Sequence, residues 1–431
     1  MNNKIDTPLR GLRSFMILWS TQMLSALGSE MTRFALIIWS YQQEGSALTT
    51  ALLSVCSYAP YVVMSIFAGA LSDRWSKKAI LLASDSVAAV CTVLVLLLLR
   101  ADGLAIWHLY ALNIISGLMN TVQQPAADLA VSLLVPKEQY QRVSGMRSFS
   151  NALVSLLAPA LATAVLTLAG LQAVLMADLL TFAAAFCALL FFVRIPRLQT
   201  ADGQQESVLR AAAAGLRYLK TNRGILDLIF FLAAINFVAS IYQAALPAML
   251  LSRPGGGEAA LGILNAVTGG ALLIGSVLAS ALPAPKSRVR VICNTLLLSM
   301  STENFCLALG QSLPIWCIGA ALGWLCIPVM NANLDVVLRS RIPIAMQGRV
   351  FSARNTLQFF TIPVGYLLGG ILVDRVFEPF MARQSAQSFW TAVFGAEKGA
   401  GAALLFFVIA VLGVLICIAF RKDPHIWALE R

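Results

Sequence analysis

The sequence from residue 69 to residue 78 reads Gly69-Ala-Leu-Ser-Asp73-Arg74-Trp-Ser-Lys77-Lys78. It joins two long apolar runs, 47–71 and 79–99. A helix needs about 20 mostly apolar residues to cross a bilayer, and each run meets that length. A short turn with one carboxylate and three cations between two such runs predicts a pair of membrane-spanning helices.

Apolar runs of similar length recur along the whole chain. We predict twelve spanning helices, over residues 14–40, 47–71, 79–99, 104–127, 145–169, 171–193, 225–251, 260–283, 289–310, 313–338, 350–373 and 399–420. The first run follows polar residues 1–13 without a small-residue cleavage site, so we expect a span and not a removed signal peptide. The connections leave no room for a separate soluble domain. The chain is therefore expected to be an all-α polytopic membrane protein.

The composition argues against several classes of protein. Among 431 residues, 59% are hydrophobic and only 12% are charged, whereas a soluble domain carries about 25% charged residues. A soluble enzyme, a disordered chain and a nucleic-acid-binding protein are poor interpretations of such a sequence. The two His and eight Cys form no cluster with metal-ligand spacing, so we expect no metal site.

The distribution of Lys and Arg predicts the orientation in the membrane. If the N-terminus is cytoplasmic, 25 of the 31 basic residues fall in inner segments and five in outer segments, while Arg33 lies within the first span. The positive-inside rule then places both termini in the cytoplasm. The net charge of +11 is explained by basic residues that face anionic headgroups, without a nucleic-acid partner.

The longest polar stretch between spans divides the chain into two halves. We predict an N-terminal bundle of six helices over 1–193, a cytoplasmic linker over 194–224 and a C-terminal bundle of six helices over 225–431. Within the linker, residues 206–222 have the pattern of an amphipathic helix. Such a helix either lies on the inner membrane surface or is an ordinary linker helix.

A repeated motif supports the division into halves. Five residues recur at an offset of 207: Asp128, Pro136, Arg142, Val143 and Arg147 match Asp335, Pro343, Arg349, Val350 and Arg354. The two copies fall in the loops after the fourth and the tenth predicted span. A duplicated unit of six helices with parallel repeats is typical of secondary transporters.

The stretch at residues 69–78 resembles the G-x3-D-R/K-x-G-x-R/K signature of the major facilitator superfamily. Within that superfamily the chain is most similar to the drug:proton antiporter branch, which holds macrolide-efflux proteins and siderophore exporters such as the enterobactin exporter. The closer likeness rests on Leu134-Val-Pro136-Lys-Glu-Gln, Val193-Arg-Ile-Pro196-Arg-Leu and Gly348-Arg-Val-Phe. The resemblance implies twelve spans in two bundles of six helices, with a central cavity lined by helices 1, 4, 7 and 10.

Three departures from the family pattern weaken a direct transfer of its proton-relay mechanism. Ser76 occupies the place of the second Gly of the signature. Ser116 lies near the place where many of these antiporters carry an Arg in the fourth helix, and Ala158-Pro159 replaces a Gly-Pro pair in the fifth.

Polar side chains form stripes on the four helices that the resemblance assigns to the cavity, as expected of helices that face a wet cavity. The alternative is that these side chains make hydrogen bonds between helices. Aromatic and Met side chains add apolar surface to the same walls, which favours amphipathic substrates. The predicted cavity residues are Gln22, Met23, Glu30, Arg33, Asn113, Met119, Asn120, Asn236, Tyr242, Gln243, Trp324, Asn331, Phe359 and Phe360.

Ionisable residues within spans are costly and are functional candidates by default. Glu30 and Arg33 lie at i,i+3 on one face and form either a structural ion pair or a proton-coupling site. Asp178 and Glu303 are further candidates for proton coupling, although the resemblance places both on peripheral helices. The alternative for both is a structural hydrogen-bonding role. Asp85 is expected to anchor the loop that carries Lys77 and Lys78.

A second set of residues is predicted to form a cytoplasmic gate that latches one conformation. For Arg142 and Arg349 the alternative is plain anchoring of basic loops at the inner membrane surface. The predicted gate residues are Gly69, Asp73, Arg74, Lys77, Lys78, Asp128, Arg142 and Arg349.

These features predict a secondary transporter of the inner membrane that exports amphipathic or lipophilic molecules in exchange for protons. A dedicated exporter of a siderophore or peptide and a lipid flippase are alternatives, and a transport-dead sensor or scaffold fits the polar stripes less well. No G-x4-G-K-S/T signature supports ATP-driven transport. The expected partners are a small-molecule substrate, protons and the lipid bilayer; we expect a monomer that has no cofactor and catalyses no reaction.

Overall fold

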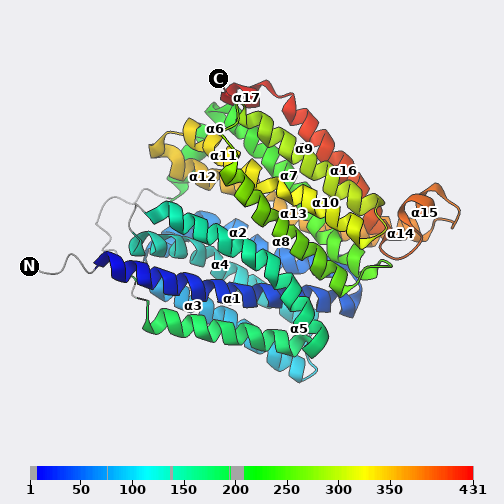
Figure 1. Cartoon of the computed structure of the whole chain (residues 1–431), viewed down its shortest axis with the longest axis horizontal. Coiled ribbons are helices and arrows are strands. Elements are labelled where there is room, and N and C mark those ends of the chain that lie inside the picture. The colour runs from blue at the N-terminus through cyan, green and yellow to red at the C-terminus, as the bar shows by residue number, and fades with distance from the viewer. Residues whose placement is uncertain (1–6, 75, 136–138, 194, 196–207, 431) are drawn as a thin grey trace, which may run out of the picture. The chain divides into compact units, whose positions relative to one another are not determined.

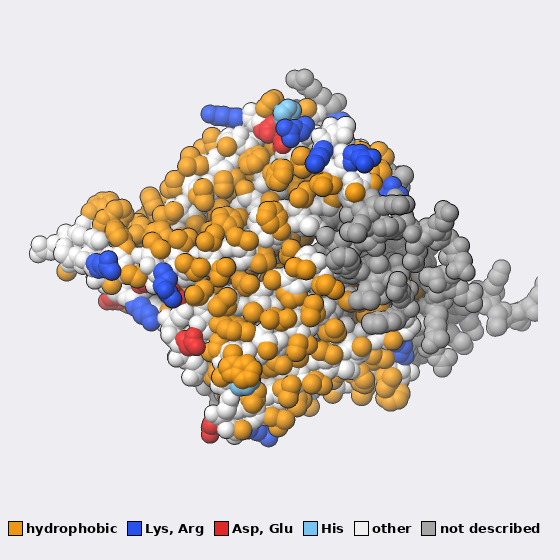
Figure 2. All heavy atoms as spheres, turned by 180° about the vertical axis from the view of Figure 1, so that it is seen from behind, with side chains coloured by type: hydrophobic (Ala, Val, Ile, Leu, Met, Phe, Trp, Pro, Cys, Tyr) orange, Lys and Arg blue, Asp and Glu red, His pale blue; other side chains and the backbone are white. Residues whose placement is uncertain are grey.

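In the computed structural model the described residues are 7–74, 76–135, 139–193, 195 and 208–430. They form helices joined by short connections, and no strand occurs among them (Figure 1). Hydrophobic side chains cover most of the described surface seen in Figure 2, and charged side chains are few on it. That distribution is the one that a lipid-embedded surface requires.

Nine helical stretches within the described residues are long and apolar enough to cross a membrane. The longest, 145–191, contains two predicted spans, so the nine stretches account for ten of the twelve. Its helix is interrupted at Gly170, where φ is 78° and ψ is 175°. The other two predicted spans coincide with α1 and α4.

The described chain separates into two compact units, one of residues 1–36 with 56–206 and one of residues 37–55 with 207–431. The end of α1 and the start of α2 therefore belong with the second unit. The predicted bundle boundaries, 1–193 and 225–431, stay a prediction.

The first unit is built mainly from five helices, α1 (Thr7–Glu44), α2 (Ala47–Arg74), α3 (Lys77–Arg100), α4 (Ile106–Leu134) and α5 (Tyr140–Phe191). In this unit α3 packs against both α4 and α5. A buried apolar cluster joins four of the helices near the start of α3, and it includes Phe15, Leu81, Leu134 and Leu189. This cluster holds the ends of the helices together beside the turn that carries the signature.

The second unit contains the remaining elements. They are α6 (Val208–Thr221), α7 (Arg223–Ser252), α8 (Glu258–Ala281), α9 (Arg288–Leu309), α10 (Leu313–Leu325), α11 (Ile327–Arg341), α12 (Ile344–Phe359), α13 (Thr361–Ile371), η2 (Leu372–Phe377), α14 (Glu378–Ala382), α15 (Phe389–Phe394), α16 (Ala400–Arg421), α17 (Pro424–Trp427) and η3 (Ala428–Glu430). Here α9 packs against α10, α11 and α16, and α7 packs against α13 and α16.

The predicted amphipathic helix of the linker is present as α6, and it packs against α12. Leu219 on its apolar side is fully buried. A Cβ added at Gly215 would lie 2.3 Å from the backbone oxygen of Arg349, so the absence of a side chain at this position permits the close approach. The apolar side of α6 is therefore covered, at least in part, by protein.

One pair of the repeated motif, Val143 and Val350, is buried in both units. Val143 is 4% exposed and Val350 is fully buried. Pro343 is the N-cap residue of α12, whereas Pro136 lies outside the described residues.

Candidate functional site

The carboxylate of Glu303 on α9 is the most enclosed acidic group of the second unit. The residue is 3% exposed. The indole Nε1 of Trp324, on α10, donates a hydrogen bond of 2.6 Å to Glu303 Oε1. Tyr242 on α7 lies close enough to interact electrostatically with Glu303, but its hydroxyl makes no hydrogen bond of acceptable geometry among the described residues. Three helices therefore meet at this carboxylate.

Two glycines on α10 make room for Glu303. A Cβ added at Gly323 would lie 2.8 Å from Glu303 Cβ and 2.9 Å from Oε2. One turn earlier, a Cβ at Gly319 would lie 2.4 Å from Cys306 Cβ. The spacing G-x3-G is the small-residue pattern that lets membrane helices approach closely. It brings the acidic side chain of α9 against the backbone of α10 and beside Trp324.

Within the described part of the chain, no Lys, Arg or His forms an ion pair with Glu303. A carboxylate held in apolar surroundings without a cation is costly in its charged form, and such intramembrane acids are functional candidates by default. The sequence placed Glu303 among the weaker candidates because the resemblance assigns its helix to the periphery. Its contacts with Trp324 and Tyr242, both predicted cavity residues, connect it to the predicted substrate site.

In the first unit a comparable carboxylate is Asp85 on α3. Gln22 Nε2 donates a hydrogen bond of 3.0 Å to Oδ2, and Gln123 Nε2 donates one of 2.7 Å to Oδ1. Asp85 was expected to anchor the loop with Lys77 and Lys78. It instead links α3 to α1 through the predicted cavity residue Gln22 and to α4 through Gln123.

Asp178 on α5 is buried and accepts hydrogen bonds from Ser29 Oγ at 3.1 Å and Thr92 Oγ1 at 3.2 Å. The hydroxyl donors come from α1 and α3. The acid therefore joins three helical segments of the first unit, which agrees with the interpretation as an interhelical hydrogen-bonding group.

Glu30 and Arg33 form the ion pair that their spacing predicts. Arg33 Nε donates to Glu30 Oε2 at 2.9 Å, and Nη2 contacts the same oxygen. The side chains are 42% and 55% exposed, respectively. The pair is therefore more open than Glu303, Asp85 or Asp178.

The other predicted cavity residues have varied environments. Asn113 donates to Leu109 O of its own helix at 2.8 Å, and Asn236 donates to Gln358 O at 3.2 Å. Asn120, Asn331 and Phe360 are exposed, while Met23, Met119, Gln243 and Phe359 are half-buried. Their role in substrate binding stays a prediction.

The predicted gate is described only in part, because the surroundings of Gly69 and the side chains of Asp73, Arg74, Asp128 and Arg142 are not described. Lys77 is buried. Lys78 Nζ donates hydrogen bonds of 2.8 Å to Leu190 O and Val193 O at the end of α5. A cation at a helix C-terminus satisfies carbonyls that have no partner within the helix.

The departure at Ser76 has a structural explanation. Ser76 has an extended backbone conformation, with φ of −64° and ψ of 134°, and its side chain accepts a hydrogen bond from Ala79 N. It is therefore the N-cap residue of α3, a position where Ser is favoured. A glycine is not required by this backbone conformation.

Sequence reasoning did not find the contacts of Glu303 and Asp85. The signal for the first was the pair Gly319 and Gly323 immediately before Trp324, which indicates a close helix approach. The signal for the second was an acid about two helical turns into a span, with amide donors on two other spans. Neither signal identifies the partner helix by itself.

Comparisons with known proteins agree with this architecture. Macrolide efflux protein A of Streptococcus pyogenes is 23% identical over 364 residues, which cover 84% of this chain and 90% of that protein. The multidrug efflux pump Tap of Mycolicibacterium fortuitum is 23% identical over 351 residues, which cover 77% of this chain and 82% of Tap. A crystal structure of a bacterial homologue of the iron transporter ferroportin has a TM-score of 0.67 at 15% identity, covering 96% of this chain and 99% of that one. This last likeness concerns the fold alone.

A family model shows to which family the chain belongs. The model of the Major Facilitator Superfamily matches residues 18–302, which is more than half of the chain. The described residues have the all-helical, multi-span fold of that family. The chain thus belongs to the Major Facilitator Superfamily and is a secondary transporter of the membrane, not an enzyme.

Proposed function

We propose that this transporter exports amphipathic or lipophilic small molecules, macrolide-like drugs among them, in exchange for protons. The names of two relatives that cover most of the chain, macrolide efflux protein A and multidrug efflux pump Tap, support the direction and the substrate class. The predicted cavity residues include Met and aromatic side chains, which accommodate varied apolar shapes.

The observation that carries the proton-coupling proposal is the enclosure of Glu303. Its carboxylate is buried, lacks a cationic partner within the described residues, and accepts a hydrogen bond from Trp324. Trp324 is half-buried, so the same indole contacts the buried acid with one edge and is partly accessible elsewhere. Protonation of Glu303 would change the group that accepts the hydrogen bond of the Trp324 indole. It would thereby change the position of this indole, which is predicted to contact the substrate.

We propose the inner membrane as the location, with both termini in the cytoplasm. The support is the distribution of Lys and Arg, 25 in inner segments against five in outer ones. Transport would follow the alternating-access cycle of the family, in which one substrate site opens to each side of the membrane in turn.

Glu30 is the competing proton-coupling residue. Its side chain is 42% exposed and already paired with Arg33. Glu303 is buried and has no cationic partner within the described residues. A change in the protonation of Glu303 therefore affects the surrounding helices more than a change at Glu30 does.

The test begins with a compound-sensitivity panel in an efflux-deficient host, which identifies a transported compound. The purified protein is then placed in liposomes under an imposed pH gradient. We expect Glu303→Gln to lower proton-driven uphill transport by at least about tenfold, corresponding to ~1.4 kcal/mol. Downhill exchange of the compound should persist, because Gln keeps the size of the side chain and an oxygen acceptor for Trp324.

Glu30→Gln serves as the comparison variant and should retain proton-driven transport. If Glu30→Gln abolishes substrate-induced proton movement while Glu303→Gln retains it, Glu30 is the coupling residue. If the unaltered protein moves no compound of the panel and no protons, the proposal of proton-coupled drug export is wrong.

A further inference from the structure

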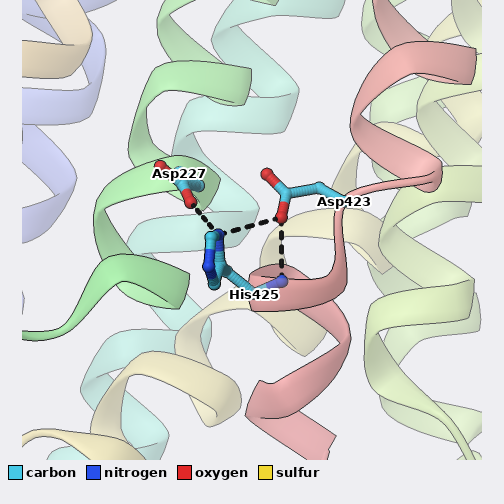
Figure 3. Close-up of side chains that lie close together, drawn as sticks. All are labelled: Asp227, Asp423 and His425. Atoms are coloured by element: carbon cyan, nitrogen blue, oxygen red, sulfur yellow. Dashed lines mark hydrogen bonds and ion pairs between the residues drawn. The ribbon is translucent and has the colours of Figure 1, made fainter.

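Three side chains that no part of the transport proposal uses meet at one end of the second unit. Figure 3 shows the ring of His425 directed toward the carboxylates of Asp227 and Asp423. His425 Nδ1 lies 3.1 Å from Asp227 Oδ2 and 3.4 Å from Asp423 Oδ1. The three potential ligand atoms all lie within 4.8 Å of one another. The cluster was not anticipated because Asp227 and His425 are 198 positions apart.

The fold holds these residues in place through contacts that do not involve the ring. Asp423 is the N-cap residue of α17 and accepts a hydrogen bond of 2.8 Å from His425 N. Ile426 is fully buried. A Cβ added at Gly224 would lie 2.4 Å from His425 O, so the backbone of α17 lies directly against the first turn of α7.

The chain after α17 is fixed as well. Glu430 Oε1 accepts hydrogen bonds from Ser287 Oγ at 2.9 Å and from Val289 N at 2.6 Å, at the start of α9. Arg341 Nη2 donates one of 2.6 Å to Leu429 O. Residues 423–430 are thus docked on three helices, and the positions of Asp423 and His425 relative to Asp227 do not depend on their own interaction.

Two of the three separations, those from His425 Nδ1, match those of a transition-metal site. Zinc binds His nitrogen and carboxylate oxygen at about 2.0–2.2 Å, usually with tetrahedral geometry, so two of its ligand atoms lie roughly 3.3 Å apart. The two distances at His425 Nδ1 bracket that value. We propose that Asp227, Asp423 and His425 form a binding site for a divalent transition metal such as Zn²⁺.

The composition of the site decides which ions it prefers. One imidazole nitrogen and two carboxylate oxygens suit zinc and the neighbouring first-row metals, whereas calcium and magnesium favour oxygen ligands alone. The side chain of His425 is 57% exposed. That exposure provides an entry path and leaves room for water at the fourth tetrahedral position.

A bound metal would tie the end of the chain to α7, one of the helices predicted to line the substrate cavity. It would also neutralise the two carboxylates. A metal that binds the folded chain and not the unfolded chain stabilises the folded chain by mass action. Zn²⁺ should therefore raise the melting temperature of the protein.

The experiment uses the full-length protein, purified in detergent without a polyhistidine tag. Equilibrium dialysis with Zn²⁺ should give one ion per chain, and Co²⁺ should give the visible absorption bands of a tetrahedral complex. Asp227→Asn and His425→Gln should each weaken binding at least tenfold and remove the thermal shift. Both variants keep side-chain size, and their melting temperatures without metal report whether the fold is retained.

The chain offers a matched control, because His108 is the other of its two His residues. Its Nδ1 accepts the backbone N–H of Ala105, the N-cap residue of α4, in the first unit. His108→Gln should bind Zn²⁺ as the unaltered protein does. Binding that persists in both Asp227→Asn and His425→Gln, or the absence of binding by the unaltered protein, would overturn the proposal and leave a His–Asp hydrogen-bond cluster.

Discussion

At the scale of single residues, Trp324 determines how the buried carboxylate of Glu303 is stabilised. Its Nε1–H is the one hydrogen-bond donor with good geometry to Glu303 within the described residues. Hydrogen bonds to charged groups contribute about 1.5–3 kcal/mol, and leaving a buried acceptor without a partner costs a similar amount. The indole is therefore more than an apolar wall of the predicted cavity.

We predict that Trp324→Phe lowers the stability of the purified protein. Phe keeps most of the ring but removes the N–H group, so Glu303 loses its donor. The expected loss is about 1–3 kcal/mol, measured by thermal unfolding in detergent. In the background of Glu303→Gln the same substitution should cost less, because a neutral amide has a smaller need for the donor. Equal losses in both backgrounds would show that packing of the indole ring, and not its hydrogen bond, is responsible.

At the scale of helices, the close contact of α9 with α10 depends on Gly319 and Gly323. The atoms nearest to an added Cβ are the Cβ atoms of Cys306 at 2.4 Å and of Glu303 at 2.8 Å. These atoms are fixed to the backbone and cannot rotate away. Separation of the two helices would relieve the clash and would also lengthen the contact between Trp324 and Glu303.

We predict that Gly319→Ala and Gly323→Ala each destabilise the protein by about 1–3 kcal/mol, as overpacking of a membrane-helix contact should. The matched control is Gly145→Ala in α5, where no atom lies within 4 Å of the added Cβ. That variant should be neutral or more stable by roughly 0.5–1 kcal/mol, because Ala favours the helix. Similar melting temperatures for all three variants would contradict the assignment of a tight α9–α10 contact.

The start of α2 is held by a residue from a distant element, Asp374 in the π-helical turn η2. Asp374 Oδ2 accepts hydrogen bonds from Ser46 Oγ at 2.6 Å and Leu48 N at 2.8 Å, and Oδ1 accepts one of 3.0 Å from Ala47 N. A carboxylate at a helix N-terminus satisfies free N–H groups and interacts favourably with the helix dipole.

We predict that Asp374→Asn destabilises the protein by about 1–2 kcal/mol, the magnitude of a lost helix cap. An amide has one acceptor oxygen, so its NH₂ group would face either the donors at Ser46 and Leu48 or the N–H of Ala47. Thermal unfolding measures the effect, with Glu397→Gln as the control because Glu397 is an exposed acid at the same end of the unit. An unchanged melting temperature for Asp374→Asn would show that water replaces the carboxylate without cost.

At the scale of the whole molecule, the sequence predicted the membrane helices well and the hydrogen-bond partners of their polar side chains poorly. Long apolar runs specify membrane helices, because backbone groups in lipid have to bond within the segment. The interruption between the fifth and sixth predicted spans coincides with the positive φ of Gly170. These features depend on local composition, and for that reason they can be read along the chain.

The partners of the polar groups depend on packing between distant segments. Trp324 and Glu303 are 21 positions apart, Gln22 and Asp85 are 63 apart, and His425 and Asp227 are 198 apart. A polar residue in a span shows that some partner is needed, but its identity follows from which helices pack together. Glu30 was ranked above Glu303 because the family resemblance assigns its helix to the cavity. That ranking did not consider Gly319 and Gly323, which let α10 approach Glu303 closely.

The repeated motif extends this reasoning to the two halves of the transporter. Val143 and Val350 are both buried in their own units, so the duplicated residues next to Arg142 and Arg349 have kept one environment. If the duplication also preserved function, the two Arg residues do equivalent work. We predict that Arg142→Ala and Arg349→Ala lower transport severalfold and to a comparable extent, measured as compound efflux normalised to the amount of protein in the membrane.

Arg383→Ala is the control for this last prediction, since Arg383 is exposed and lies outside the repeat. It should transport as the unaltered protein does, which separates the effect of the motif from a general loss of positive charge. Comparable losses in both motif variants would mean that each unit contributes one Arg to the transport cycle. A large loss in one variant and none in the other would mean that the repeat is inherited architecture and that the halves have diverged in function. Positive-inside anchoring alone would leave efflux intact in both variants and change only their insertion.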